Sequence, residues 1–305
     1  MQTTMILLQK IAEMFLLMAA GFVLFRKGLL GEQGTADIGR LLTLAVIPVI
    51  LINSLWADRT AEKTAVLVQS AVASALLMAL SVAAAVLIFP KDGVSCFGAA
   101  FSNAGFIGIP LVQSVLGGDA AFLISAMIVM IGLLQYTVGL VMITGDKGTM
   151  KLKAVLKNPV VLSVALGTAL YAANIPKPAL AASVFSTVGS LNTPLAMLLL
   201  GAYLAKTDLK KVFAVRSSYT VSLVRLLLIP LAGALLLRAL PLGSSELKLA
   251  LFITSACPAG SLGAIFAQQY GKDYEKATGQ VCISTVLCMA SIPLMAALCG
   301  GLLQA

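Results

Sequence analysis

The sequence predicts an all-α integral membrane protein with ten transmembrane helices in two inverted five-helix repeats, whose fourth and ninth spans are broken and crossed. Composition gives the first reason, because 60% of the residues are hydrophobic and 11% are charged, whereas a soluble domain has roughly 25% charged residues. The second reason is a proline- and glycine-containing interruption in the fourth apolar segment of each half. The third is the uneven distribution of Lys and Arg between alternate loops.

Apolar segments of about 20 residues, the length that crosses a bilayer, divide the 305 residues into ten spans, with no room for an appended soluble domain. The predicted spans are 5–25, 38–56, 66–89, 94–116, 120–144, 159–173, 180–204, 216–240, 248–270 and 276–300. The first segment lacks a basic start and a small-residue cleavage site, and Arg26 and Lys27 follow it. We therefore expect a span there and not a cleaved signal peptide.

The basic residues predict the orientation of these spans. Loops after odd-numbered spans hold 14 of them: Arg26, Lys27, Arg40, Lys91, Lys147, Lys151, Lys153, Lys157, Lys206, Lys210, Lys211, Arg216, Lys272 and Lys276. The opposite side holds 6: Lys10, Arg59, Lys63, Lys177, Arg238 and Lys248. Because Lys and Arg concentrate on the cytoplasmic side, we expect a multi-pass protein of the cytoplasmic (inner) membrane with both termini on the extracytoplasmic side.

The chain divides into residues 1–144, the first five-helix repeat, and 159–305, the second. Residues 145–158 (GDKGTMKLKAVLKN) form a basic cytoplasmic connector, which we expect to be solvated, with contact to anionic lipid as the alternative. The second span of each half carries a proline, Pro48 and Pro194, and the fourth span carries Pro110 or Pro258. Since five spans is an odd number, the second repeat enters the membrane inverted.

The stretch FSNAGFIGIPL predicts a helix interrupted at membrane depth, because Pro110 removes a backbone hydrogen bond and clashes with the preceding turn. A second interruption lies at CPAG, residues 257–260. Two interrupted spans at matching positions indicate the binding site of a transporter, and the helix N-termini that they expose suit a carboxylate. The predicted substrate-binding residues are Asn103, Gly105, Ile107, Gly108, Pro110, Ser255, Cys257, Pro258, Ala259, Gly260 and Ser261.

Each of these residues also has a structural interpretation. Asn103 could contact substrate or cap its own broken helix, and the glycines could serve helix packing. Arg225, placed inside a span, is a counter-charge for the substrate anion, or it snorkels or pairs with a backbone carbonyl. Glu13 pairs with Lys10 or is a proton site. Further candidates for the path or for satisfying kinks are Gln135, Asn53, Asn192 and Gln280.

Several function classes are disfavoured. The chain has no His and its five Cys are scattered, so we expect no catalytic residues, no metal and no cofactor. The basic residues form no arm or amphipathic face, so we expect no nucleic acid. No Asp or Glu lies across either break, which favours carrying an organic anion over exchanging cations. A proton- or sodium-coupled symporter or antiporter stays open, as does a substrate sensor that does not transport.

The segments NAGFIGIPL, MAAGFVLFRKGLLGE, LLTLAVIP and CPAGSLGAIFAQQYGKDYEKATGQVCISTVLCMASIPL resemble the auxin efflux carrier family over nearly the whole chain. Asn103, Pro110 and Pro258 fall on the family's motif positions. Further residues follow Pro258 at family-like spacing: Tyr270, Asp273, Ser284, Thr285 and Pro293.

The resemblance implies a fold shared in outline with bile-acid sodium symporters and sodium–proton antiporters. Spans one, two, six and seven would form a scaffold through which two copies form a homodimer. The other six would form a transport domain that moves as an elevator, carrying an organic anion. The long hydrophilic central loop of the plant auxin exporters is missing here. The resemblance therefore favours a bacterial malonate-type permease for a small mono- or dicarboxylate over an auxin-like acid.

Overall fold

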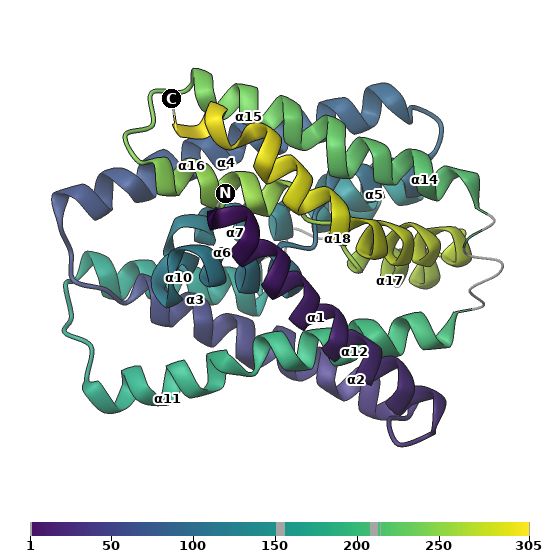
Figure 1. Cartoon of the computed structure of the whole chain (residues 1–305), viewed down its shortest axis with the longest axis horizontal. Coiled ribbons are helices and arrows are strands. Elements are labelled where there is room, and N and C mark those ends of the chain that lie inside the picture. The colour runs from purple at the N-terminus through teal and green to yellow at the C-terminus, as the bar shows by residue number, and fades with distance from the viewer. Residues whose placement is uncertain (1, 151–155, 208–212, 214, 305) are drawn as a thin grey trace.

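The computed structural model describes residues 2–150, 156–207, 213 and 215–304, and among these it contains helices and no strand (Figure 1). Four of the basic residues that predict the orientation, Lys151, Lys153, Lys210 and Lys211, lie outside the described residues, and so does part of the predicted connector.

The first half contains long helices and several short ones. They are α1 (Gln2–Arg26), α2 (Glu32–Leu41), α3 (Ile47–Leu55), α4 (Ala61–Ile88), α5 (Gly93–Ala100), α6 (Ile109–Leu116), α7 (Ala121–Leu134) and α8 (Leu140–Thr144). Three π-helical segments continue them: η1 (Leu42–Val46), η2 (Ala104–Gly108) and η4 (Gln135–Gly139). Two 3-10 turns follow α6 and α8: η3 (Gly118–Ala120) and η5 (Lys147–Thr149).

The second half is also built of helices of unequal length. Its helices are α10 (Pro159–Ala172), α11 (Ala179–Ser190), α12 (Asn192–Lys206), α14 (Arg216–Leu223), α15 (Ile229–Ala239), α16 (Ser245–Ser255), α17 (Leu262–Gln269) and α18 (Tyr274–Gln304), with a π-helical segment η6 (Val224–Leu228) between α14 and α15. In Figure 1 the long α18 and α1 cross the face toward the viewer.

Seven helices in the described residues are long and apolar enough to cross a membrane. They are Met5–Arg26, Glu32–Leu55, Ala61–Ile88, Gly118–Thr144, Ala179–Lys206, Arg216–Ala239 and Tyr274–Leu303. Each coincides with one of the ten predicted spans. The predicted span 159–173 is a shorter apolar helix, and 94–116 and 248–270 are broken into two pieces each. The chain is therefore a multi-pass, all-helical membrane protein.

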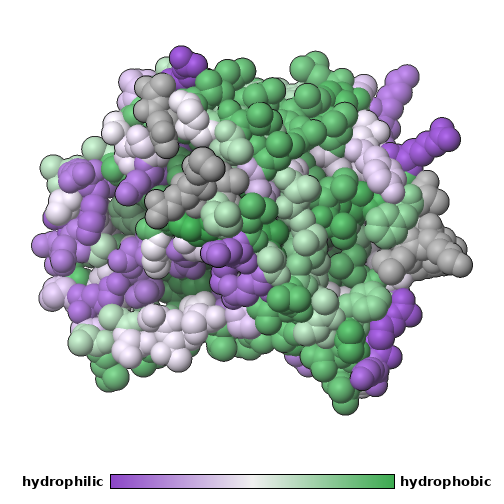
Figure 2. Space-filling model, in the orientation of Figure 1, coloured by the Kyte–Doolittle hydropathy of each residue, from purple (hydrophilic) through white to green (hydrophobic). Residues whose placement is uncertain are grey.

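The outer surface agrees with a bilayer environment. Hydrophobic side chains cover a broad central band in Figure 2, and hydrophilic ones gather toward the two ends of the long axis. The side chains of Leu16, Leu87 and Leu180 are 74%, 79% and 77% exposed. A band of exposed leucines is expected where lipid tails replace water as solvent.

Three Ile-Pro pairs stand directly after a π-helical segment: Pro48 after η1, Pro110 after η2 and Pro230 after η6. A π-helical turn carries one extra residue, so the helix accommodates a proline that has no N–H and crowds the preceding turn. The chain is consequently helical from Ala104 through Pro110 to Leu116. The prediction that Pro110 interrupts the fourth span is wrong in position, because the non-helical residues are 101–103.

The helices can be divided into two groups, which also contact each other where α1 packs on α18 and α6, and where α3 and α10 pack on α7. The first contains α1, α12, α3, α10 and α11, since α1 packs along α12 and α3 packs on α10 and α11. The second contains the remaining long helices, with α4 on α5 and α7, and α18 on α14, α15 and α17. A Cβ added at Gly201 would overlap the carbonyl oxygen of Met18, and one at Gly21 would overlap that of Leu198. Close backbone approach through small residues is how membrane helices pack tightly.

An ion pair joins the two halves within the second group. Asp92 is the N-cap of α5 and accepts a hydrogen bond from the backbone N–H of Ser95 (3.2 Å). Its other carboxylate oxygen accepts from the Lys276 ammonium in the first turn of α18. Burial raises the pKa of the Asp92 carboxyl, but the hydrogen bonds and charge from Lys276 and Ser95 outweigh it and hold the pKa below its usual value.

Replacing Asp92 with Asn is expected to lower the free energy of unfolding by about 1 kcal/mol, because water screens a pair whose Asp92 side chain is 34% exposed. A group with a lowered folded-state pKa stabilises fully above its unfolded pKa. The difference between wild type and Asp92→Asn should therefore be constant down to about pH 4 and shrink below it. Thermal unfolding at several pH values measures this. Asp37→Asn, which breaks an exposed pair with Arg40, serves as the control and should change little; an equal loss in both variants would contradict the assignment.

Candidate functional site

The two broken spans meet at their interruptions. The Asn103 N–H donates to the Pro258 carbonyl (2.8 Å), and the Gly260 N–H donates to the Phe101 carbonyl (2.9 Å). Ser102 and Ala259 form an antiparallel bridge between these bonds. Backbone groups released from a helix inside a membrane need partners, and each break supplies them to the other. The prediction that the breaks come together is confirmed.

We call this meeting of residues 101–103 with residues 256–261 the crossing. Four helix ends lie at the crossing, two C-terminal and two N-terminal. The C-terminal ends of α5 and α16 are at Ala100 and Ser255. The N-terminal ends of η2 and α17 are at Ala104 and Leu262. Helix C-termini carry about −0.5 elementary charge each and N-termini about +0.5.

Both N-terminal ends open onto one cavity of about 510 Å³. It lies between the two helix groups, and the described residues lining it are Ala36, Gly39, Arg40, Thr43, Leu44, Ile47, Ser102, Asn103, Ala104, Gly105, Phe106, Ile128, Ile131, Gly132, Gln135, Tyr136, Asn158, Val160, Tyr203, Gly260, Ser261, Leu262 and Ile265. Arg40 is the one charged side chain in that set, and it is 72% exposed. The walls are mostly apolar.

Asn103 occupies the N-cap position of η2, yet its side chain makes no capping hydrogen bond. The residue is 6% exposed, and its amide nitrogen Nδ2 has no hydrogen-bond partner among the described residues. Its backbone carbonyl accepts from the N–H groups of Ile107 (3.1 Å) and Gly108 (3.3 Å). A buried donor without a partner costs about 1–3 kcal/mol, so a ligand that accepts from Nδ2 would relieve that cost.

Five of the predicted side chains or glycines line the cavity: Asn103, Gly105, Gly260, Ser261 and Gln135. A Cβ at Gly260 would lie 3.1 Å from Gln135 Nε2 and 3.4 Å from the Ser102 carbonyl oxygen. The glycine therefore lets η4 approach the crossing closely.

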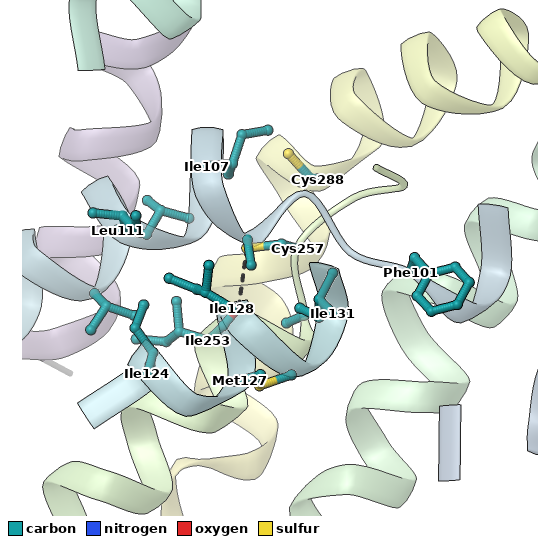
Figure 3. Packing of buried hydrophobic residues seen from close by; sticks show 14 of the residues in the cluster. Phe101, Ile107, Leu111, Ile124, Met127, Ile128, Ile131, Ile253, Cys257 and Cys288 are labelled. Atoms are coloured by element: carbon teal, nitrogen blue, oxygen red, sulfur yellow. Dashed lines mark hydrogen bonds between the residues drawn. The ribbon is translucent and has the colours of Figure 1, made fainter. Parts of the chain in front are cut away.

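Seven other predicted binding residues do not line it: Ile107, Gly108, Pro110, Ser255, Cys257, Pro258 and Ala259. Figure 3 shows Cys257 among apolar side chains that include Ile107, Ile128 and Ile253. The Cys257 thiol donates to the Ile253 carbonyl (3.3 Å), and the Ala259 N–H donates to Ser284 Oγ (3.1 Å). These residues lie on the side of the crossing that faces away from the cavity. Only part of a non-helical segment between two helices can face the cavity.

Three of the four other polar candidates hold helices together. Asn53 accepts the Lys177 ammonium through its carbonyl (2.6 Å) and Oδ1 (3.1 Å). Asn192 donates through Nδ2 to the Gly105 carbonyl (3.3 Å). Gln280 donates through Nε2 to Ser95 Oγ (2.8 Å). Lys10 and Glu13 form the local pair that their spacing predicts, at 2.9 Å.

Arg225 is 1% exposed and lies behind the crossing, outside the cavity lining. Its Nη1 donates to the carbonyls of Ala99 and Ala100, both at 3.1 Å, and its Nη2 donates to the Ser255 carbonyl. Of the alternatives for this residue, the structure has the pairing with backbone carbonyls.

The sequence reasoning missed the opposite wall of the cavity. Arg40, Thr43 and Ile47 recur at three- and four-residue spacing on the second span, which places them on one helix face. That spacing could have predicted that these three residues face the same side of the helix. Phe106, Tyr136 and Tyr203 also line the cavity, and each is an aromatic residue in an apolar segment that lacks a comparable signal.

Comparison with known proteins agrees with this architecture. The family model described as "Membrane transport protein" matches residues 6–296. The chain is 24% identical over 298 residues to an uncharacterised transporter of Methanothermobacter thermautotrophicus, covering 94% of this chain and 96% of the relative. A match across nearly the whole length leaves no large segment unaccounted for. The chain belongs to the membrane transport protein family, the auxin efflux carrier family, and is a transporter.

Proposed function

We propose that the protein carries an organic monocarboxylate across the cytoplasmic membrane, binding it in the cavity beside the crossing. The observation that carries this proposal is the convergence of two helix N-termini and the unpartnered Nδ2 of Asn103 on one cavity. Two N-terminal ends at about +0.5 each sum to about one positive charge. That sum matches a single carboxylate.

The apolar walls favour a substrate with an apolar body. Ile47, Ile128 and Phe106 are among the apolar residues that line the cavity, and 510 Å³ is within the range of small-molecule sites. A dicarboxylate such as malonate would bring a second charge, for which the described lining offers only the exposed Arg40. Burying an unpaired charge is costly, so a monocarboxylate is preferred.

The mechanism we propose is alternating access by an elevator movement. Ten spans would form two inverted five-helix repeats. The first helix group, which contains α1 and α12, would be the stationary scaffold through which two copies dimerise. The second group would carry the crossing past it. The position of the cavity between the two groups supports this, because sliding one group would expose the same site on the other side. With both termini outside, the Arg40 end of the cavity faces the cytoplasm.

The test is counterflow in proteoliposomes of purified protein, with a panel of aromatic and branched-chain monocarboxylates and short dicarboxylates. Monocarboxylates should exchange faster than malonate. Absence of counterflow with every organic anion would refute the proposal, and a preference for dicarboxylates would refute its substrate class.

Replacing Asn103 with Ala is expected to reduce monocarboxylate counterflow about 10- to 100-fold, because a hydrogen bond to a charged group contributes about 1.5–3 kcal/mol. Equal amounts of folded protein are ensured by size-exclusion chromatography. Ser114→Ala is the control, since among the described residues that hydroxyl bonds only the Leu111 carbonyl of its own helix (2.7 Å), and it lies outside the cavity lining. Wild-type counterflow by Asn103→Ala would leave this side chain with no role in binding.

A further inference from the structure

The two helix C-termini at the crossing have a different partner from the N-termini. Arg225 reaches them from η6, a π-helical segment of the eighth predicted span, where its side chain is fully enclosed. One guanidinium nitrogen binds the last two carbonyls of the α5 end, at Ala99 and Ala100, and the other binds the last carbonyl of α16, at Ser255. Both half-helices are thus joined through a single side chain.

No carboxylate balances this buried cation in the part of the chain that the structure describes. The three ion pairs found there are Lys10–Glu13, Arg40–Asp37 and Lys276–Asp92, and none involves Arg225. A buried charge without compensation is strongly destabilising. The compensation available is the pair of helix C-termini, which at about −0.5 each sum to about one negative charge.

We propose that Arg225 is a positioning residue that serves as a built-in cation for the crossing. Its charge neutralises the C-terminal ends of both half-helices, in the role that a coupling sodium ion takes in carriers whose broken helices coordinate one through carbonyls and helix C-terminal ends. A carrier with this cation covalently attached needs no sodium or potassium ion to complete the fold of its crossing. The N-terminal ends then remain as the uncompensated charge that faces the substrate.

The geometry around Arg225 distinguishes this role from simple packing. Three carbonyl acceptors from two helices converge on its two terminal nitrogens, while Nε is buried with no hydrogen-bond partner among the described residues. A side chain kept only for its volume would not need a charge. A neutral side chain of similar length, methionine, fills much of the same space but leaves the three carbonyls without a cation.

Thermal unfolding of the purified full-length protein tests this without any substrate. The wild-type Tm should be the same in sodium, potassium, lithium and choline chloride. Arg225→Met should lower Tm by about 10 °C in choline, and sodium or lithium should restore part of that loss by binding the carbonyls of Ala99, Ala100 and Ser255 that the guanidinium no longer occupies. Arg225→Lys, which keeps the charge, should lie between the two and respond less to cations.

Arg238→Met, an exposed arginine at the end of the same span, is the matched control and should neither lose stability nor respond to cations. A wild-type Tm that rises specifically with sodium would overturn the proposal. So would an Arg225→Met variant as stable as wild type, or one that is destabilised but indifferent to cations, since that is a packing role. If Arg225→Met cannot be purified, the wild-type and Arg225→Lys responses decide between the same outcomes.

Transport gives a second readout, which rests on the proposed function. Wild-type counterflow should be unchanged when choline replaces sodium, whereas Arg225→Met should be slower and partly rescued by sodium. If no organic anion is carried, the proposed function fails while the thermal results still decide the role of Arg225.

Discussion

Substituting Asn103 with aspartate is expected to reduce monocarboxylate transport more than 100-fold while the protein still folds. Aspartate is as good an N-cap as asparagine, so η2 keeps its start. The new carboxylate, at a position that is 6% exposed, would lie between the two N-terminal ends and take the place of the substrate's charge. Like charges brought together in such a site cost several kcal/mol, which is more than a factor of 100.

The measurement is counterflow at matched protein density, together with Tm to show that the variant is folded. Asn174→Asp makes the same chemical change at an exposed turn, where Oδ1 accepts from the Arg59 N–H (2.9 Å), and should transport like wild type. Transport by Asn103→Asp at the wild-type rate would show that the substrate anion does not bind beside residue 103. Loss in both variants would point to a general effect of added negative charge.

Replacing Gly201 with alanine is expected to lower Tm by about 5–10 °C. The added Cβ would overlap the Met18 carbonyl and press on the Phe22 backbone nitrogen. These atoms belong to the backbone of α1, so no side chain can rotate away, and α1 and α12 would have to separate. The contact between α1 and α12 is the most extensive one between two helices in the described residues.

Gly300→Ala in α18 is the matched control, because a Cβ there meets nothing within 4 Å. Alanine is the better helix former by about 1 kcal/mol, so this variant should equal or exceed the wild-type Tm. An unchanged Tm for Gly201→Ala would mean that α1 and α12 do not pack as closely as the structure has them.

The prolines show where sequence reasoning reaches its limit. Pro258 lies in a true interruption. Pro110 lies in a continuous helix because the extra residue of the π-helical segment η2 accommodates it, as η1 accommodates Pro48. The break of the fourth span is at 101–103, which contains no proline or glycine. Local propensity cannot identify such a break, since its backbone groups are satisfied by the other half of the chain, at Pro258 and Gly260.

Arg225 and Cys257 illustrate the same limit for side chains. Their types and depth in apolar segments made both of them candidates for substrate contact, yet both lie behind the crossing. Which side of a broken helix faces a cavity depends on helices from distant parts of the sequence. Asn103, Gly105 and Gly260, which the sequence predicts to bind substrate, line the cavity because they sit on the helix N-terminal side of the breaks.

The sequence by itself determined the membrane class, the seven of its ten predicted spans that are single helices of crossing length, and the presence of a break in each half, because hydropathy and backbone chemistry act locally. Only the tertiary structure decided where the first break lies, which residues face the cavity and what the buried arginine binds. Those features depend on hydrogen bonds between residues far apart in the sequence, such as Asn103 with Pro258 and Arg225 with Ala99, and no local pattern encodes such a pairing.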